Sequence, residues 1–211
     1  IVSNSGSNDV VVLLGDGQGA NWQLRLGPRL AAGQGPVHTA IGDATADGVV
    51  DIVVTNERED RVFVLPGRGG GFFDDRPDSI VTYDVGPQPV QSFFSGNSLA
   101  TLNRGSNTLS FFANSNPLLG RSFPTYGSRP VAAVLGDFDF DRRTELIVAH
   151  ELDGLFSIFS ADTDGFTLLR AQHFAGLSHP TDLAVWDDRG RISVFGVGDG
   201  RETAVLLFSA V

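Results

Sequence analysis

The stretch Pro36–Asn56, PVHTAIGDATADGVVDIVVTN, decides the fold, because it joins two apolar runs through an acidic loop. Nearly the same order returns in Pro130–His150, PVAAVLGDFDFDRRTELIVAH. Short continuous runs of Val, Ile and Leu are typical of strands that are buried on both faces. The Asp-rich segment between the runs is typical of a turn. Each stretch therefore predicts two neighbouring strands joined by an acidic loop.

The second run of this pair recurs along the chain at a nearly constant interval. Segments that begin at Ile52, Leu99 and Leu146 are 47 residues apart. Related segments begin at Ile1, 51 residues before Ile52, and at Ile192, 46 residues after Leu146. Each period contains four predicted strands separated by turns. Four antiparallel strands in a repeat of about 40 to 50 residues are the sequence signature of a β-propeller blade.

We therefore predict an all-β fold, a β-propeller of four-stranded antiparallel blades with about five blades, three of them complete and two incomplete. The chain forms a single domain, 1–211, with repeats at approximately 1–35, 36–88, 89–129, 130–179 and 180–211. We expect these blades to close as a compact ring. The alternative is an arc of a larger, seven-bladed propeller, completed by another chain or by further residues. A β-sandwich would not predict so regular a recurrence.

Composition excludes several function classes. The 211 residues include no Cys and no Met, and all 15 cationic residues are Arg. Disulfides, a Cys nucleophile and a Lys Schiff base are thus excluded. A net charge of −10 argues against nucleic acid as a partner. The sequence contains no run of 18 apolar residues, so membrane insertion is not predicted. The absence of Met is expected of a mature form or a fragment.

The two acidic loops are candidate metal sites, because each places oxygen atoms at its first, third, fifth and ninth positions. Alternating short oxygen side chains on a tightly wound loop can converge on one hard cation such as Ca²⁺. The predicted ligands are Asp43, Thr45, Asp47 and Asp51 with the carbonyl of Val49 in the first loop, and Asp137, Asp139, Asp141 and Glu145 with the carbonyl of Arg143 in the second. Alternatively, both loops are metal-free turns held by side-chain-to-backbone hydrogen bonds.

One residue weakens the metal prediction for the second acidic loop, and no metal is predicted in the corresponding loops of the other two repeats. Arg142 occupies the position at which a sharp calcium-binding turn prefers Gly. The corresponding loops of the other two repeats, Gly96–Ser98 and Asp187–Gly190, are shorter, and we predict that neither binds Ca²⁺.

These motifs resemble FG-GAP or VCBS repeats. The resemblance rests on Pro36–Asn56 and Pro130–His150, and on Asn4–Asn8 with the following hairpin segment Val10–Gly17. It covers essentially the whole chain. It implies a β-propeller of the type found in integrin α-subunit heads, with Ca²⁺ in the blade loops. Members of the family are mostly secreted, periplasmic or cell-surface proteins that act in adhesion and assembly, so the implied location is extracellular, periplasmic or at the cell surface.

The sequence contains no recognisable catalytic constellation. The Gly-rich segments Gly15–Gly19 and Gly67–Gly71 are interpreted as hairpin turns, and no Ser lies in a Gly-x-Ser-x-Gly motif. We therefore expect no enzyme, but a Ca²⁺-stabilised module for protein–protein interaction or adhesion, with a protein partner or self-association. The alternative is a carbohydrate-binding propeller or an accessory domain of a polysaccharide-active enzyme, with Trp22 and Trp186 as candidates for stacking on a sugar.

Overall fold

The computed structural model describes residues 1–138, 141–173, 178–187, 192–198 and 203–208. In these residues the chain forms antiparallel strands, three short 3₁₀ turns and no α-helix. The 3₁₀ turns are η1 (Gly19–Asn21), η2 (Ala113–Ser115) and η3 (Pro117–Leu119). Among the described residues, no helix is long and apolar enough to cross a membrane.

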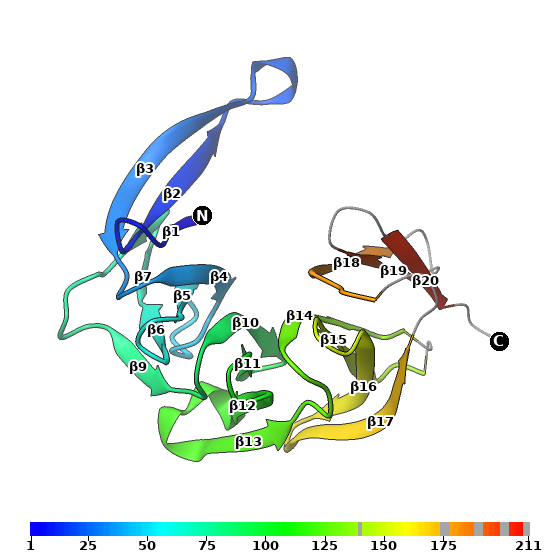
Figure 1. Ribbon diagram of the computed structural model, residues 1–211. Coiled ribbons are helices and arrows are strands. Elements are labelled where there is room, and N and C mark those ends of the chain that lie inside the picture. Colours follow the sequence, from blue (N-terminus) through cyan, green and yellow to red (C-terminus); the bar gives the residue numbers. More distant parts are fainter. Residues whose placement is uncertain (139–140, 174–177, 188–191, 199–202, 209–211) are drawn as a thin grey trace.

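Five sheets follow one another in chain order (Figure 1). The first contains β1 (Val2–Asn4), β2 (Asp9–Asp16) and β3 (Gln23–Ala31). The second contains β4 (Pro36–Gly42), β5 (Asp51–Asn56), β6 (Arg61–Leu65) and β9 (Val81–Asp84). The third contains β10 (Pro89–Ser95), β11 (Ser98–Asn103), β12 (Thr108–Phe112) and β13 (Gly120–Pro124). The fourth contains β14 (Pro130–Gly136), β15 (Thr144–His150), β16 (Leu155–Asp162) and β17 (Gly165–His173).

The fifth sheet contains β18 (Asp182–Asp187), β19 (Ile192–Val197) and β20 (Thr203–Phe208). A separate small hairpin of β7 (Gly67–Gly69) and β8 (Phe72–Phe73) is inserted between β6 and β9. Three four-stranded sheets lie between two three-stranded ones, so the predicted blade architecture, three complete and two incomplete, is confirmed.

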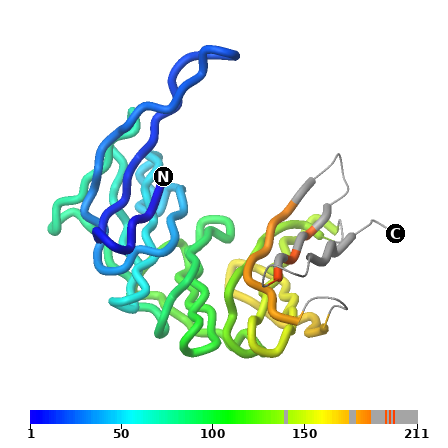
Figure 2. Tube along the Cα trace, turned by 45° about the horizontal axis from the view of Figure 1, so that its top comes forward, coloured from blue at the N-terminus to red at the C-terminus, as the bar shows by residue number. Residues whose placement is uncertain are grey.

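The sheets form an open arc, and not the closed five-bladed ring that we expected. The first and last sheets lie at opposite ends of the arc in both views (Figures 1 and 2). Neighbouring sheets meet through their Pro-led strands, β4 against β10, β10 against β14 and β14 against β18. The five sheets therefore do not complete a circle (Figures 1 and 2). The expectation of closure was wrong, because the strand count does not determine the rotation from one sheet to the next.

Over the described residues, the hydrophobic core consists of four separate clusters, one at each junction between successive sheets. Ile52 and Val54 of β5 pack toward the first sheet, whereas Val53 packs toward the third. The same alternation places Ile147 of β15 against the fifth sheet and Val148 against the third. Strands β5 and β11 are buried along their whole length, because a sheet covers each of their faces. This burial explains their continuous apolar sequences.

A repeated latch connects each of the first three sheets to the strand that begins the next. Its central residue is Asn8, Asp60 or Asn107, each in a left-handed backbone conformation with φ between 54° and 59°. The carbonyl oxygen accepts a hydrogen bond from the segment that leaves the sheet, and Oδ1 accepts one from a residue nearer the next strand. For Asn107 the donors are Thr125 N at 2.9 Å and Arg129 N at 2.7 Å. Each latch thus fixes the connection between two sheets.

Candidate functional site

The first acidic loop connects β4 to β5, and its carboxylates accept hydrogen bonds from the backbone of the loop itself. Asp43 accepts from Asp47 N at 3.1 Å and from Gly48 N at 2.9 Å. Asp47 accepts from Val49 N at 2.8 Å. Both aspartates are exposed at the surface. The loop therefore has the hydrogen bonds of an Asp-rich turn, as expected for the metal-free alternative.

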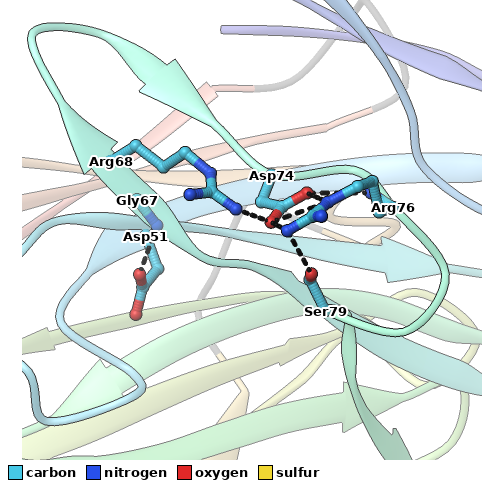
Figure 3. Close-up of polar contacts among 6 residues, drawn as sticks. All are labelled: Asp51, Gly67, Arg68, Asp74, Arg76 and Ser79. Carbon is cyan, nitrogen blue, oxygen red and sulfur yellow. Dashed lines mark hydrogen bonds and ion pairs between the residues drawn. The ribbon is translucent and has the colours of Figure 1, made fainter.

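Asp51 anchors this loop to the body of the second sheet. Its carboxylate is fully buried and accepts hydrogen bonds from Ala44 N at 2.8 Å and Thr45 N at 2.9 Å. Its other oxygen accepts a bond of 2.8 Å from Gly67 N, at the start of the β7–β8 hairpin (Figure 3). One carboxylate thus joins the acidic loop, β5 and the inserted hairpin.

A second buried carboxylate, Asp74, holds the inserted hairpin together. It accepts hydrogen bonds from the guanidinium groups of Arg68 and Arg76, and Arg76 also donates to Ser79 Oγ at 3.3 Å (Figure 3). The hydrogen bonds from Arg76 and then Arg68 hold the pKa of Asp74 far below its usual range, against the opposing effect of burial. Two of the arginines in this repeat, Arg68 and Arg76, therefore have a structural role in the hairpin.

The second acidic loop connects β14 to β15 and repeats part of this arrangement. Glu145, at the ninth position, accepts from Phe138 N at 2.8 Å, as Asp51 accepts from Ala44 N. Asp137 accepts from Arg142 N at 3.0 Å, and Asp141 accepts from Arg143 N at 2.8 Å. Arg142 adopts φ 70°, the left-handed conformation that Gly would favour. Asp139 lies outside the described residues.

Among the described residues, two buried side-chain oxygen atoms at predicted ligand positions have no hydrogen-bond partner. They are Thr45 Oγ1 in the first loop and Asp137 Oδ1 in the second, and both are buried. Unpaired buried oxygen atoms are compatible with a bound cation, since leaving them without a partner is costly. Within the described ranges, however, no group of three or more His, Asp or Glu side chains is arranged to hold a metal ion. Calcium binding therefore stays a prediction.

A pocket of 380 Å³ lies between the first acidic loop and the short β10–β11 turn. Ile41 and Phe94 form an apolar wall, and the Phe94 ring lies directly against Gly42, where a Cβ atom would be 2.5 Å from Cε2. Asp43, Asn97 and Asn114 form the polar wall. The short turn leaves this space open, because the two-residue connection at Gly96 and Asn97 is much shorter than the acidic loop beside it.

The polar wall is built on a strained turn. Asn114 and Ser115 both have φ 50°, a conformation that residues other than Gly seldom adopt. Asn114 N donates to Ser98 Oγ at 3.1 Å, and Ser115 Oγ donates to the Asn97 carbonyl at 2.9 Å. Such strain persists only where surrounding contacts enforce it, and it is often found at functional sites.

A buried tyrosine, Tyr83, contacts this turn from the core side and holds it by a hydrogen bond. The Tyr83 hydroxyl donates a hydrogen bond to the Ser115 carbonyl, and its ring packs edge-on against Phe112 at 4.9 Å between centroids. Burial, and next the negative charge of Asp51, raise the pKa of Tyr83 to about 12. The hydroxyl therefore stays protonated and remains a donor at neutral pH.

Sequence reasoning identified the short turn but missed Asn97, Asn114 and Ser115 as parts of a pocket. The sequence Asn114-Ser115-Asn116 is an ordinary polar turn, and its strain depends on Ser98 and Tyr83, which are distant in sequence. Of the two predicted sugar-stacking residues, Trp22 is 57% exposed, and the side chain of Trp186 lies outside the described part of the chain.

Comparison with known proteins relates the chain to others by fold alone. No family model matches it, and neither does any curated protein sequence. Among solved structures, BBS1N in complex with ARL6DN matches with a TM-score of 0.61 and 14% identity, over 87% of this chain and 55% of that one. A putative 6-phosphogluconolactonase from Bacteroides uniformis matches with the same TM-score and identity, over 94% of this chain and 63% of that one.

Hydrazine synthase from Kuenenia stuttgartiensis matches with a TM-score of 0.52 and 18% identity, over 84% of this chain and 51% of that one. The chain thus spans between about half and two thirds of the length of these structures. Their likeness confirms the β-propeller type of fold.

Proposed function

We propose that the chain is a non-catalytic β-propeller module that binds another protein through the outward face of its first sheet. The supporting observation is a row of exposed apolar side chains on that face. The other face of this sheet buries Val10 and Val12 against the second sheet. Stacking of sheets in a propeller covers apolar faces, and exposed apolar side chains gathered on one face of a sheet are typical of a docking surface.

The exposed apolar side chains of Val2, Leu24 and Leu26 share one face of the first sheet. The strand register shows this, because their partners Val11 and Leu13 are two residues apart in β2 and point to the same side. Val2 lies opposite Val11 in the β1–β2 pair, and Leu26 lies opposite Leu13 in the β2–β3 pair. Leu24 is two residues from Leu26 and therefore points to the same side. Trp22 continues this side and is close to Gly15, where a Cβ atom would be 3.0 Å from the indole nitrogen.

The comparisons support a binding role only by analogy of fold. The BBS1N structure is a complex with a second protein, ARL6DN, whereas another similar structure is described as a putative lactonase. We propose binding and not catalysis for this chain, and we expect no hydrolysis of 6-phosphogluconolactone above background. The FG-GAP or VCBS relationship, adhesion, and a location outside the cytoplasm belong to the same proposal.

A photo-crosslinking amino acid at position 26 tests this proposal in cells that express the protein naturally. We expect one dominant adduct, whose mass identifies either a partner or a second copy of the chain. The matched control is the same amino acid at position 169, where Leu169 is also exposed but lies on β17 of the fourth sheet. Equal labelling from both positions, or none from position 26, would contradict the proposal.

We also propose that Ca²⁺ binds the acidic loops and stabilises them, with the unpaired oxygens of Thr45 and Asp137 as support. Titration calorimetry after chelation should show binding heat, and Ca²⁺ should raise the melting temperature. Asp43→Asn should weaken binding at the first loop, and Asp137→Asn at the second. No heat and no rise in melting temperature would exclude calcium from both loops.

A second candidate function is carbohydrate binding, favoured by the exposed indole of Trp22. Indole rings provide flat amphipathic surfaces on which sugars stack. A glycan array with the wild-type chain and with Trp22→Ala tests this alternative. Saccharide binding that disappears in Trp22→Ala would favour it over the protein-binding proposal.

A further inference from the structure

The pocket between the first acidic loop and the β10–β11 turn has the chemistry of a receptor for one long cationic side chain. We propose that it binds an arginine side chain of a partner protein. This inference rests on the proposed binding function, but it concerns a different surface from the outward face of the first sheet. It assigns the pocket a ligand class and assigns specific tasks to Asp43, Phe94 and Asn114.

The apolar wall fits the aliphatic part of an arginine. Ile41 is 58% exposed and Phe94 is half-buried, so both present carbon surface to an incoming chain. Arginine covers apolar surface with its methylene groups while its charged end reaches a polar region. Its planar guanidinium also stacks on aromatic faces, which distinguishes it from lysine.

The polar wall supplies acceptors for the guanidinium. In the metal-free loop, the carboxylate of Asp43 is exposed and accepts hydrogen bonds only from uncharged backbone groups, so its negative charge is not neutralised by an arginine of the described chain. The described residues that line the pocket include no cationic side chain. The amide oxygens of Asn97 and Asn114 are further acceptors, whereas an anionic ligand would be repelled by Asp43.

The strained turn holds the polar wall in one conformation before a ligand binds. Hydrogen bonds to Ser98 Oγ, the Asn97 carbonyl and Tyr83 hold Asn114 and Ser115 in their left-handed conformation before any ligand arrives. A rigid site loses less conformational entropy on binding than a mobile one. The pocket volume of 380 Å³ lies within the range of small-molecule sites and accommodates one side chain with its flanking backbone.

A second pocket, on the other side of the turn, has charges of both signs near it. A neighbouring pocket of 370 Å³ shares Gly96, Asn97 and Asn114, but its far wall contains Thr144 and Asp162. Thr144 directly follows Arg142 and Arg143, both of which are exposed. Charges of both signs are therefore near that second pocket, and it favours neither kind of ligand.

Nuclear magnetic resonance titration with N-acetyl-arginine amide tests the proposal, with chelator present so that no metal occupies the loop. We expect saturable amide shifts confined to residues 41–46, 94–97 and 114–115, with millimolar affinity. N-acetyl-citrulline amide, which has nearly the same shape but no charge, should bind at least about tenfold more weakly. Nα-acetyl-lysine amide should bind more weakly than the arginine compound, because its ammonium group has no planar face to stack on Phe94.

Two variants locate the interaction. Asp43→Asn should weaken arginine binding about fivefold or more, and Asn114→Gly should weaken it while keeping the left-handed backbone. Asp162→Asn, in the neighbouring pocket, is the matched control and should leave binding unchanged. The proposal is overturned by the absence of saturable shifts, by equal binding of citrulline, or by shifts that map elsewhere. Because the probe is a small molecule, failure here leaves the crosslinking result at position 26 unaffected.

Discussion

His150 ends β15 opposite Pro130, at the position that Asn56 occupies opposite Pro36 and Asn103 opposite Pro89. All three polar side chains are fully buried. A connecting Gly approaches each of them closely, and a Cβ atom at Gly127 would be 2.4 Å from His150 Cγ. Equivalent buried positions in the three repeats are thus occupied by Asn, Asn and His. Of these side chains, only the His can gain a proton and become charged.

Protonation of His150 should make the fold sensitive to acid. Burial lowers the pKa of His150, against the raising effects of its bond to the Leu155 carbonyl and of nearby Asp153. A pKa that is lower in the folded chain means that the unfolded chain binds the proton more readily. Stability is therefore present at neutral pH and is lost as the pH falls below the ordinary histidine value of 6.5.

His150→Asn, which copies the other two repeats, should fold and reduce this acid sensitivity. Chemical denaturation at a series of pH values measures it. Burial also lowers the pKa of His38, so His38→Asn is a useful companion variant and should remove a further part of the effect. An unchanged slope of stability with pH in both variants would assign the acid sensitivity to other groups.

Asp51 should be the most important acid of the first loop for folding. Asp51→Ala would leave the buried N–H groups that now donate to it without an acceptor, at a cost of about 3 kcal/mol or more in the free energy of unfolding. Asp47→Ala, on the exposed part of the same loop, should cost less than about 1 kcal/mol. Denaturant unfolding in the presence of chelator compares them, and equal costs would refute the anchoring role.

At the scale of elements, the latches connect the sheets, and the sequence already shows their repetition. Asn4–Asn8 and Asn103–Asn107 are nearly identical turns, and in both the last Asn is the latch residue. The strands could also be predicted from the sequence, since the strand predicted to begin at Leu146 lies within β15. The strained η2 turn could not be read from sequence, because contacts with Ser98 and Tyr83 impose its conformation. The acidic loops fall between these cases: their turns were predictable, whereas the anchoring of Asp51 to Gly67 depends on the inserted hairpin.

Asn107→Gly isolates the side-chain part of one latch. Glycine accepts the left-handed conformation, so the main loss is the hydrogen bond from Arg129 N to Oδ1. We expect a loss of about 1 kcal/mol in the free energy of unfolding. Asn114→Gly is the control, because it has a similar φ and the exposed side chain lies in the pocket wall. Similar stability losses in the two variants would indicate a backbone effect of Gly and not a latch.

At the scale of the whole molecule, the open arc connects the fold to the proposed function. The four core clusters bury the faces between sheets, but the outward face of the first sheet keeps exposed Val2, Leu24 and Leu26. The period of 47 residues predicted the sheets and their order correctly. It could not predict the rotation between sheets, which depends on side-chain packing at each junction and on the short latched connections.

The proposed function requires the open arc, because a closed ring would cover the surface proposed for the partner. Small-angle X-ray scattering on the monomeric 22.4 kDa chain tests it most directly. We expect a scattering profile that fits the open arc of Figure 1 and does not fit a closed five-sheet ring. A profile of a compact disc, in which the first and last sheets are in contact, would contradict it.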